Sequence, residues 1–486
     1  MKLKELISQA FPEHPQIPVL PDLEVSGIET DSRAVKKGFI FIAVHGAKKD
    51  GHDFIPQALS NGASVLVVDK KISIVSDVSL VEIPDARAAS ARLAAIFYGK
   101  PSEFMSVIGI TGTNGKTTSS YLLEHLLSME QKKTGVIGTI SYRFGGQEIP
   151  AVETTPGPLK IQFMLSGMKE ARCEYVVMEA SSHALDQKRV AEIDFSVALF
   201  TNLTQDHLDY HGSMEAYFEA KARLFTELLP GKIAAINVDD EWGRKLPAKT
   251  KAKALTYGIL GPADFRAENI IYHADSSEWN LVHGGKKIKI FSPLAGRHNV
   301  YNVLGAFAVL GGLGFSLEKA AQNLKSFAGV PGRLEPVRSG QSFQVFVDFA
   351  HTPDGLLNVL RALQDLRKKK LFVVFGCGGD RDKNKRPKMG RIASEYSDFV
   401  YVTSDNPRSE NPKTIAEEIC AGFPANFKNY SVVIDRHKAI RQALLSAREG
   451  DIVLLAGKGH ERTQIIGNQN QPFNDREEAE RVLNGY

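Results

Sequence analysis

The stretch Val107–Leu127, VIGITGTNGKTTSSYLLEHLL, runs from an apolar strand through a glycine-rich loop into a helix. Glycines at 112 and 115 let the loop bend so that several backbone N–H groups face one point, and the helix N-terminus adds partial positive charge. From there Lys116 can reach the β- and γ-phosphates of a nucleotide, and the hydroxyl of Thr117 can bind Mg²⁺. This order of strand, loop and helix predicts a phosphate-binding loop on a parallel sheet.

One position departs from the usual spacing of such loops, because Ile110 stands where the first glycine is expected. A glycine-rich turn before a helix is the alternative interpretation, but strand, loop, Gly-Lys-Thr-Thr and helix all occur in the required order. The loop does not distinguish an enzyme from a nucleotide switch or a motor, so the chemistry must be sought elsewhere in the chain.

Short apolar runs alternate with helical patterns along almost the whole chain. Most of these runs are unbroken rather than alternating, which is typical of parallel strands buried on both faces. The order of strands and helices therefore predicts doubly wound α/β domains. The candidate strands are 64–68, 106–110, 174–178, 196–200, 233–237, 371–375, 398–402 and 451–456, and helical stretches include 115–130, 213–229, 353–368 and 436–448.

Length and two composition seams predict three domains. At about 150 residues per domain, 486 residues suggest about three. The segments YGKPSEF (98–104) and FAGVPGRLEPV (327–337) interrupt the pattern with glycine and proline. We therefore expect domains over residues 1–100, 101–330 and 331–486, the central one a P-loop ATPase-like domain with a parallel sheet.

Composition predicts a cytoplasmic, soluble chain. The net charge is only +4, which gives no overall field to recruit nucleic acid or an anionic membrane. Three isolated cysteines form no disulfide framework and no metal-ligand spacing, as in a reducing compartment. The N-terminus reads as a short amphipathic helix without the apolar core of a signal peptide, and no run approaches the ~18 apolar residues of a membrane span. We expect no nucleic-acid partner and no membrane association.

Two further strands end in polar residues that suit a metal. Glu179 closes the run EYVVME, and the run ending at Phe200 leads into a loop that carries Asp206, His207, Asp209 and His211. Ligands bind at such strand ends in open α/β sheets, so a strand-end Glu and His could share a divalent metal. Each residue taken alone is as easily a capping or hydrogen-bonded loop group.

Lys221 lies in the helical stretch YFEAKARLF, with Phe218, Leu224 and Phe225 at helical spacing around it. Its spacing alone favours a lysine whose stem covers an apolar face while its ammonium reaches water.

These segments together resemble the Mur ligase family, most closely the branch that adds the third residue of the peptidoglycan stem. The resemblance covers nearly the whole chain and rests on several long, rare motifs. They are GTNGKTT, ETTP, MEASSHAL, TNLTQDHLDYHG, YFEAKARLF, GRHNVYN, GVPGRLE, DFAHTPDGL, FGCGGDRDKNKRPKMG, DNPRSE and AGKGHE.

The resemblance implies a first domain for the UDP end of the substrate, a middle domain for ATP and a Rossmann-like C-terminal domain for the incoming amino acid. It implies ATP-dependent amide formation through an acyl phosphate on the D-Glu side chain of UDP-MurNAc-L-Ala-D-Glu, by an enzyme we expect to be a monomer. Catalytic roles fall on Lys116, His207 and Lys221. The matching lysine is carbamylated in the family, so Lys221 becomes N6-carboxylysine and joins Thr117, Glu179 and His207 as a Mg²⁺ ligand.

The family motifs also assign binding residues position by position. For ATP they are Gly112, Thr113, Asn114, Gly115, Lys116, Thr117, Thr118, Asn299, Arg333, Asp348 and His351. For UDP-MurNAc-L-Ala-D-Glu they are Thr30, Ser32, Thr154, Thr155, Ser181, Gln187 and Arg189. Interdomain packing is the alternative role for Asn299 and Arg333. Glu153 departs from the pattern, since a relative can carry an amide there.

The stretch TSDNPRSENP (403–412) bears on the incoming amino acid, which in this family is mainly meso-diaminopimelate or L-lysine. Diaminopimelate ends in both an ammonium and a carboxylate, and a planar guanidinium suits a carboxylate. Arg408 therefore favours diaminopimelate, with Glu461 for the ammonium and Arg381 for a further carboxylate. Asp405, Asn406, Pro407 and Gly457 complete the predicted site.

Three alternatives stay open at this point. The same ligase could add L-lysine, or the chain could be a member that adds alanine, glutamate or a dipeptide. It could also be a non-catalytic nucleotide-binding protein on the ligase fold, although the joint presence of Lys116, Glu179, His207 and Lys221 argues against lost catalysis.

Overall fold

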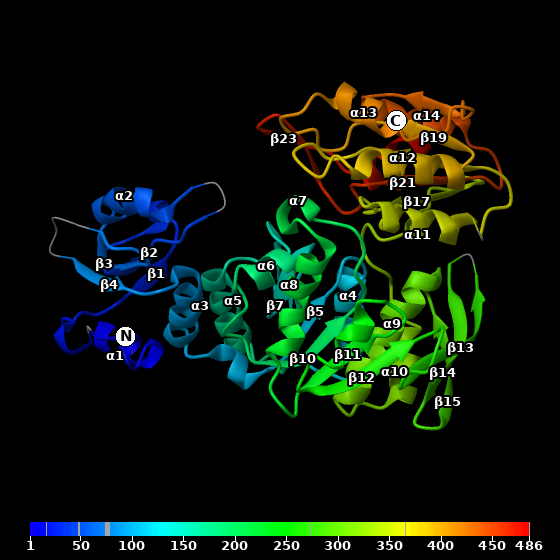
Figure 1. Ribbon diagram of the computed structural model, residues 1–486. Helices are drawn as coiled ribbons and strands as arrows, with labels where there is room; N and C mark the ends of the chain where they lie inside the picture. The colour runs from blue at the N-terminus through cyan, green and yellow to red at the C-terminus, as the bar shows by residue number, and fades with distance from the viewer. Residues whose placement is uncertain (16, 47–48, 73–77, 274, 365, 486) are drawn as a thin grey trace. The chain divides into compact units, whose positions relative to one another are not determined.

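A computed structural model describes the chain except for residues 16, 47–48, 73–77, 274, 365 and 486 (Figure 1). The chain forms two compact units. The first comprises Met1–Thr111, Glu130–Ala198 and Arg223–Lys232, and the second comprises Gly112–Met129, Leu199–Ala222 and Ile233–Tyr486. The boundary between them falls within strand β10 (Phe195–Phe200) and helix α8 (Met214–Thr226).

The first unit begins with a four-stranded parallel sheet in the order β1-β2-β3-β4. Successive side chains along its strands pack into two different cores. Ile40 and Val65 pack with α1 and α3, whereas Phe41 and Leu66 pack with α2. Burial on both faces is what an unbroken apolar run such as 64–68 requires. The elements are α1 (Leu3–Ala10), β1 (Gly27–Glu29), β2 (Phe39–Ile42), α2 (Ile55–Ser60), β3 (Ala63–Val68), β4 (Ser79–Glu82) and α3 (Ala86–Phe97).

The rest of the first unit holds strands in the order β5-β9-β6-β7-β8, of which the first three pair in parallel and the last two antiparallel. Helix α5 packs against α3. The elements are β5 (Ser106–Thr111), β6 (Thr134–Ile137), β7 (Ser141–Phe144), β8 (Gln147–Pro150), α5 (Pro158–Glu170), β9 (Tyr175–Glu179) and α6 (Ser182–Asp186).

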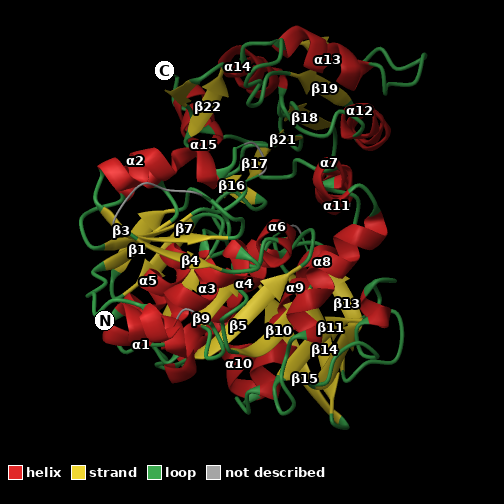
Figure 2. Cartoon of the chain, turned by 60° about the vertical axis from the view of Figure 1, so that its left-hand side comes forward, coloured by secondary structure: helices red, strands yellow, loops and turns green. Residues whose placement is uncertain are grey.

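The second unit starts with α4 (Lys116–Met129), the helix predicted after the glycine-rich loop. Strands β11 and β12 pair in parallel, but β13, β14 and β15 continue as an antiparallel meander that the sequence analysis did not predict (Figure 2). The remaining elements here are α7 (Leu208–His211), β11 (Ile233–Asn237), β12 (Lys253–Gly258), β13 (Phe265–Tyr272), β14 (Ser277–His283), β15 (Lys286–Ser292), α9 (Arg297–Gly312) and α10 (Leu317–Leu324).

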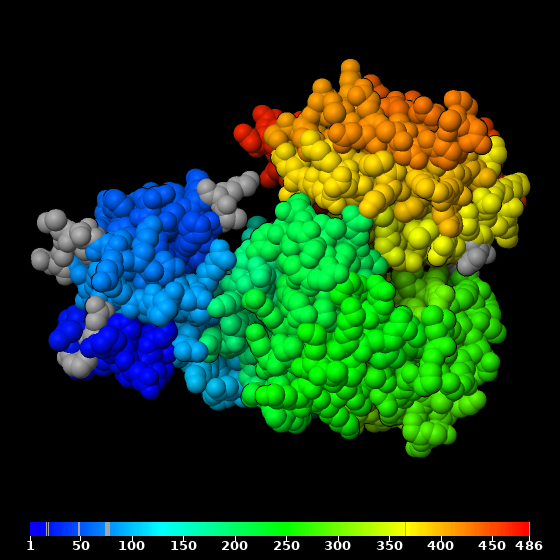
Figure 3. Space-filling view, in the orientation of Figure 1, coloured from blue at the N-terminus to red at the C-terminus, as the bar shows by residue number. Residues whose placement is uncertain are grey.

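Residues from about 332 onward form one continuous body, coloured yellow to red in Figure 3. Its sheet has the order β16-β17-β21-β18-β19-β20 and is parallel except for β16. Helices α11, α12 and α13 cover one face, and α14 and α15 cover the other. The strands are β16 (Glu335–Val337), β17 (Gln344–Asp348), β18 (Leu371–Phe375), β19 (Phe399–Val402), β20 (Tyr430–Val432) and β21 (Ile452–Ala456).

The helices of this body are α11 (Pro353–Gln364), α12 (Lys385–Tyr396), α13 (Pro412–Cys420), α14 (Arg436–Ser446) and α15 (Asp475–Leu483), and β22 (Thr463–Ile466) pairs antiparallel with β23 (Gln469–Pro472). The eight predicted strands and four predicted helices are all present within a few residues of their expected limits, so the α/β prediction is confirmed. In the described part of the chain, no helix is long and apolar enough to cross a membrane.

A buried ion pair joins the two helices on one face of the C-terminal sheet. Arg436 donates to both carboxylate oxygens of Asp475, at 2.7 and 2.6 Å, and to the carbonyl of Ala456 at 2.9 Å. Both side chains are fully buried. Burial of an ion pair is costly, and the pair is stable only while both partners are present.

We therefore predict that Asp475→Asn lowers the free energy of unfolding of this body by about 3–5 kcal/mol, because it leaves a buried guanidinium without its countercharge. Hydrogen exchange in peptides that cover α14, β21 and α15 measures the change. Glu395→Gln, which breaks an exposed pair with Arg391, is the matched control and should cost less than about 1 kcal/mol. Equal protection in the two variants would contradict the prediction.

Candidate active site

The glycine-rich loop has the backbone that its sequence predicts. Gly112 has φ 148° and Gly115 has φ 86°, both in the region that favours glycine. A Cβ atom at Gly112 would collide with the hydroxyl of Thr201, and one at Gly115 with the side-chain oxygen of Asn302. The loop therefore needs glycine both for its conformation and for space.

The loop is braced by the segment that follows β10. Asn202 accepts from the backbone N–H of Asn114 at 2.9 Å and donates to its carbonyl at 3.2 Å, and the Thr201 hydroxyl donates to the same carbonyl at 2.7 Å. Thr113 Oγ accepts from the N–H of Thr204 at 3.0 Å. The sequence analysis missed Thr201, Asn202 and Thr204, although their polar run directly after a buried strand was a usable signal.

Two lysines converge on the carbonyl oxygen of Gly112. Lys116 Nζ donates to it at 2.9 Å and to the carbonyl of Thr113 at 3.0 Å, and Lys221 Nζ donates to it at 2.9 Å. Lys221 is 1% exposed, so the interpretation of this lysine as one that reaches water is wrong. Burial and then the nearby Lys116 ammonium hold the pKa of Lys221 well below its usual range, against the opposing pull of Asp206. Loss of a proton from this amine is therefore easier than from an exposed lysine.

His207 lies beside an acid at the start of α7. It has φ 53°. Its backbone N–H donates to the Asp206 carboxylate at 2.9 Å, and its ring Nε2 lies 3.4 Å from the same carboxylate. Burial would raise the pKa of Asp206, but His207, His351 and Lys385 together lower it. Burial and then Lys385 lower the pKa of His351 to about 4. The structure thus brings His207 and His351, two predicted site residues, to the same carboxylate.

Glu179 ends β9 in the first unit and is fully buried. Its two carboxylate oxygens accept from the N–H and the hydroxyl of Thr139, at 3.0 and 2.8 Å. Thr139 also contacts the Thr154 hydroxyl at 3.1 Å, and Thr155 donates to the Glu179 carbonyl at 2.7 Å. Thr139, which the sequence analysis missed, links the predicted metal ligand to the predicted substrate threonines.

Within the described residues, no group of three or more His, Cys, Asp or Glu side chains is arranged to hold a metal ion. Glu179 belongs to the first unit, whereas His207 and Lys221 belong to the second. That these side chains share Mg²⁺ stays a prediction.

Arg189 is held by the residues predicted to accompany it. Its guanidinium donates to Gln187 Oε1 at 3.0 and 2.8 Å and to the Thr155 carbonyl at 2.8 Å. It also pairs with Glu153 at 2.6 Å. The hydroxyl of Ser181 instead accepts from Ala184 N at 3.2 Å and so caps α6.

At the N-terminal sheet, Ser32 is buried and donates to Gln57 Oε1 at 2.6 Å, while Thr30 is exposed.

The residues predicted near the nucleotide divide into two kinds. Arg333 reaches the Thr117 hydroxyl at 3.3 Å, so it contacts the start of α4. Asn299 is buried; it donates to the carbonyl of Ala295, just before α9, at 2.8 Å and accepts from Asn302 Nδ2 at 3.0 Å. Both carboxylate oxygens of Asp348 accept from backbone N–H groups, those of Leu334 and Ala350.

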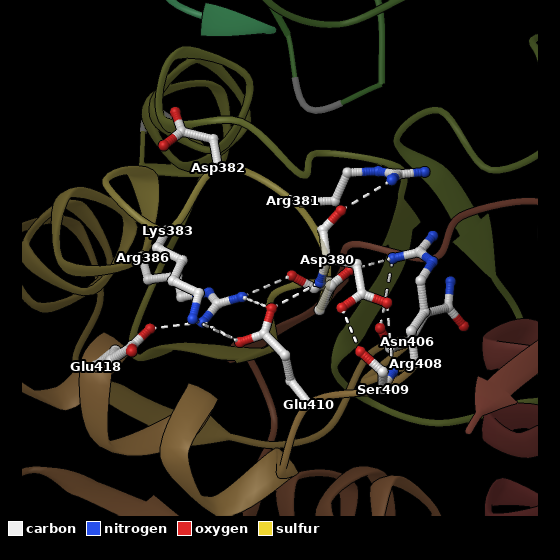
Figure 4. A network of polar contacts seen from close by, with 12 residues as sticks. Asp380, Arg381, Asp382, Lys383, Arg386, Asn406, Arg408, Ser409, Glu410 and Glu418 are labelled. Atoms are coloured by element: carbon white, nitrogen blue, oxygen red, sulfur yellow. Dashed lines mark hydrogen bonds and ion pairs between the residues drawn. The ribbon is translucent and has the colours of Figure 1, made fainter. Parts of the chain in front are cut away.

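The segment that carries Arg408 lies against the loop after β18 (Figure 4). Arg408 has φ 50°, and its Nη1 donates to the carbonyl of Gly379 at 2.8 Å. Arg381 donates only to the carbonyl of Asp380, at 2.9 Å. Among the described residues neither arginine forms an ion pair with a carboxylate. Burial and then the nearby Arg381 lower the pKa of Arg408, as expected for two cations held close together.

Glu410, an acid of the same loop as Arg408, is paired with another arginine. Both oxygens of Glu410 accept from Arg386, at 2.9 Å each, and one also accepts from Asp380 N at 2.6 Å. Arg386 is fully buried and pairs with Glu418 as well, and its contacts lower the pKa of Glu410 to about 2. Figure 4 shows this network joining the two loops, so Glu410 positions the loops.

Asp405 and Asn406 are buried where the loop turns. Asp405 accepts from Asn406 N at 2.6 Å, and Asn406 Nδ2 donates to Glu461 at 2.9 Å. Gly457 has φ 110°, and a Cβ atom there would lie 2.7 Å from the Asp405 carboxylate. Pro407 is buried, and its carbonyl accepts from Glu410 N at 3.0 Å. The structure thus brings the predicted amino-acid residues together at the carboxyl ends of β18, β19 and β21.

Three family models match successive parts of the chain. They are the Mur ligase family catalytic domain over residues 24–106, the Mur ligase middle domain over 110–310 and the Mur ligase glutamate ligase domain over 332–459. The chain belongs to the Mur ligase family.

Similar Mur ligases extend over its full length. A UDP-N-acetylmuramoyl-L-alanyl-D-glutamate–2,6-diaminopimelate ligase of Syntrophomonas wolfei is 45% identical, with 100% of this chain and 99% of that protein covered. The ligase of the same name from Bacillus cereus is 42% identical at the same coverage. A solved structure of a ligase with this name matches with a TM-score of 0.69 and 33% identity over 100% of this chain and 99% of that one. The three-domain α/β Mur ligase fold is therefore confirmed, while the domain limits near 100 and 331 stay predictions.

The brace on the glycine-rich loop generates a test of this Mur ligase. Asn202→Ala leaves the N–H of Asn114 without its side-chain partner and removes one of the two donors to its carbonyl, which costs about 1–3 kcal/mol. We expect the KM for ATP, the nucleotide that the motif predicts, to rise about tenfold or more. Steady-state kinetics measure it, and Asn426→Ala at an exposed position is the control. An unchanged KM in a folded Asn202→Ala protein would contradict the role of the brace.

Proposed function

We propose that this chain joins meso-2,6-diaminopimelate to the D-Glu of UDP-MurNAc-L-Ala-D-Glu, with conversion of ATP to ADP and phosphate, in peptidoglycan synthesis. One observation carries the choice of amino acid. Arg381 and Arg408 lie on adjacent loops near the half-buried Glu461, and among the described residues neither arginine forms an ion pair with a carboxylate. The full-length relatives that bear the diaminopimelate ligase name support the same choice.

The first half of the reaction places a carboxylate against a triphosphate, so cations must neutralise the site. The backbone of residues 112–115 and the ammonium of Lys116 would hold the β- and γ-phosphates. A carboxylate oxygen of the substrate attacks the γ-phosphorus, the bond from that phosphorus to the ADP oxygen breaks, and an acyl phosphate results. Arg189, fixed by Gln187 and Thr155, is aimed to orient the substrate carboxylate.

Mg²⁺ would neutralise the phosphate charge and draw the carboxylate toward the γ-phosphate when bound. The donors fit a hard cation, because Thr117 supplies a hydroxyl and Glu179 a carboxylate. His207 is a less usual ligand for Mg²⁺.

Lys221 would complete the set as a carbamate. Its buried amine, once deprotonated, would attack CO₂: an N–C bond forms, one C=O π bond of CO₂ breaks and one proton leaves the nitrogen, so the neutral amine becomes an anionic carbamate.

In the second half, the amine of the amino acid attacks the acyl carbon and a tetrahedral intermediate expels phosphate. Arg408 and Arg381 would hold carboxylates of diaminopimelate, and Glu461 its distal ammonium. L-Lysine lacks the second carboxylate, and a half-buried guanidinium left without its partner is unfavourable. We expect the enzyme to act as a monomer in the cytoplasm.

An amino-acid panel tests the proposed function. With ATP and UDP-MurNAc-L-Ala-D-Glu, we expect phosphate release and amide product with meso-diaminopimelate and at least a hundredfold lower kcat/KM with L-lysine. Coupled phosphate release and mass spectrometry of the product are the measurements. Equal turnover with lysine would refute the specificity.

The matched variant for this panel is Arg408→Lys, which keeps the charge and loses the planar fork. Its KM for diaminopimelate should rise while its KM for ATP stays within twofold. An unchanged KM for diaminopimelate would remove Arg408 from the site.

Lys221→Ala tests the carbamate. The substitution removes the buried amine, so we expect activity to fall at least a hundredfold. Short carboxylic acids such as acetate should restore part of it by supplying the lost anionic oxygen. Lys249→Ala, at a partly exposed lysine near the same helix, is the control and should keep full activity. Absence of rescue across several acids would count against the carbamate.

A further inference from the structure

A fully buried lysine lies behind the predicted amino-acid residues. Lys458 follows β21, and its side chain is 0% exposed. Its Nζ donates to Glu461 Oε2 at 2.7 Å and to Asn406 Oδ1 at 3.1 Å. Its two recorded side-chain partners are thus both residues assigned to the incoming amino acid.

These contacts fix the orientation of the Asn406 amide. Its Oδ1 accepts from Lys458 and, at 2.9 Å, from the backbone N–H of Ile465, so the oxygen end faces two donors. Its Nδ2 therefore faces Glu461 and donates to it at 2.9 Å. A flipped amide would place its NH₂ group, a donor, against the ammonium of Lys458 and the N–H of Ile465, which are donors too.

The same contacts fix Glu461. One carboxylate oxygen accepts from both Lys458 and Asn406, which holds the side chain against the protein. The side chain is still 31% exposed, so it stays accessible to a ligand. The buried ammonium of Lys458 needs a countercharge, and Glu461 provides it.

We propose that Lys458 is a positioning residue for the incoming amino acid: it orients the side chains of Asn406 and Glu461. The proposal rests on the proposed function and assigns a role to a residue beyond those that touch the substrate.

Lys458→Met, which keeps the stem and removes the ammonium, tests the proposal in the full-length enzyme. We expect the KM for meso-diaminopimelate to rise at least tenfold, while the KM values for ATP and UDP-MurNAc-L-Ala-D-Glu stay within twofold. A purely structural role would instead lower the folded fraction or shift all three KM values together. Lys413→Met, at an exposed lysine in the first turn of α13, is the control and should leave every constant unchanged.

The double variant Lys458→Met with Glu461→Gln removes both charges of the pair. Because Lys458 acts through Glu461, we expect its KM for diaminopimelate to be no higher than that of Lys458→Met. A KM equal to the product of the two single effects would overturn the proposal, as would an unchanged KM in folded Lys458→Met. If Lys458→Met does not fold, the double variant is compared with Glu461→Gln, and a tenfold higher KM overturns the proposal.

The activity of the wild-type enzyme distinguishes failure of the proposed function from failure of the role proposed for Lys458. A wild-type enzyme that forms no product with diaminopimelate refutes the proposed function itself. An active wild type whose Lys458→Met variant keeps its KM refutes only the role of Lys458.

Discussion

Parallel strands that are buried on both faces leave mainly their carboxyl ends free to carry polar groups, and the chemistry of this protein collects there. The phosphate loop follows β5, Glu179 ends β9, and the brace at 201–204 follows β10. In the C-terminal body, Arg381, Arg408 and Lys458 follow β18, β19 and β21. The polar residues of the candidate site thus lie at or directly after the ends of the apolar runs that form the sheets.

The buried arginines and the cations of the candidate site differ in their hydrogen-bond partners. Arg386 and Arg436 are buried, and each is paired with carboxylates of the protein. Lys116 and Lys221 converge instead on one backbone carbonyl, and Arg408 bonds only to backbone carbonyls among its described contacts. Cations that lie close together in this way favour the binding of an anionic ligand. Phosphate, carboxylate and, at Lys221, a carbamate are the anions that suit these places.

The partners of its acidic side chains also explain how the loop at 403–412 is held. The loop carries two acids, Asp405 and Glu410. Glu410 binds Arg386, and Asp405 accepts from the N–H of Asn406. Both acids of the loop are therefore held by hydrogen bonds within the protein.

The sequence by itself determined the α/β class, the glycine-rich loop before α4 and eight of the strands, because unbroken apolar runs and Gly-Lys-Thr-Thr are local patterns. It did not predict the β13–β15 meander, although KKIKIFS (286–292) alternates, because the strands were identified from unbroken runs. Only the tertiary structure decided the depth of Lys221, the brace from Asn202 to Asn114 and the pairing of Lys458 with Asn406. Those contacts join residues 52 to 109 positions apart, or turn a side chain inward rather than outward. Spacing along a chain fixes which face a residue occupies, whereas burial and partners follow from how the elements pack.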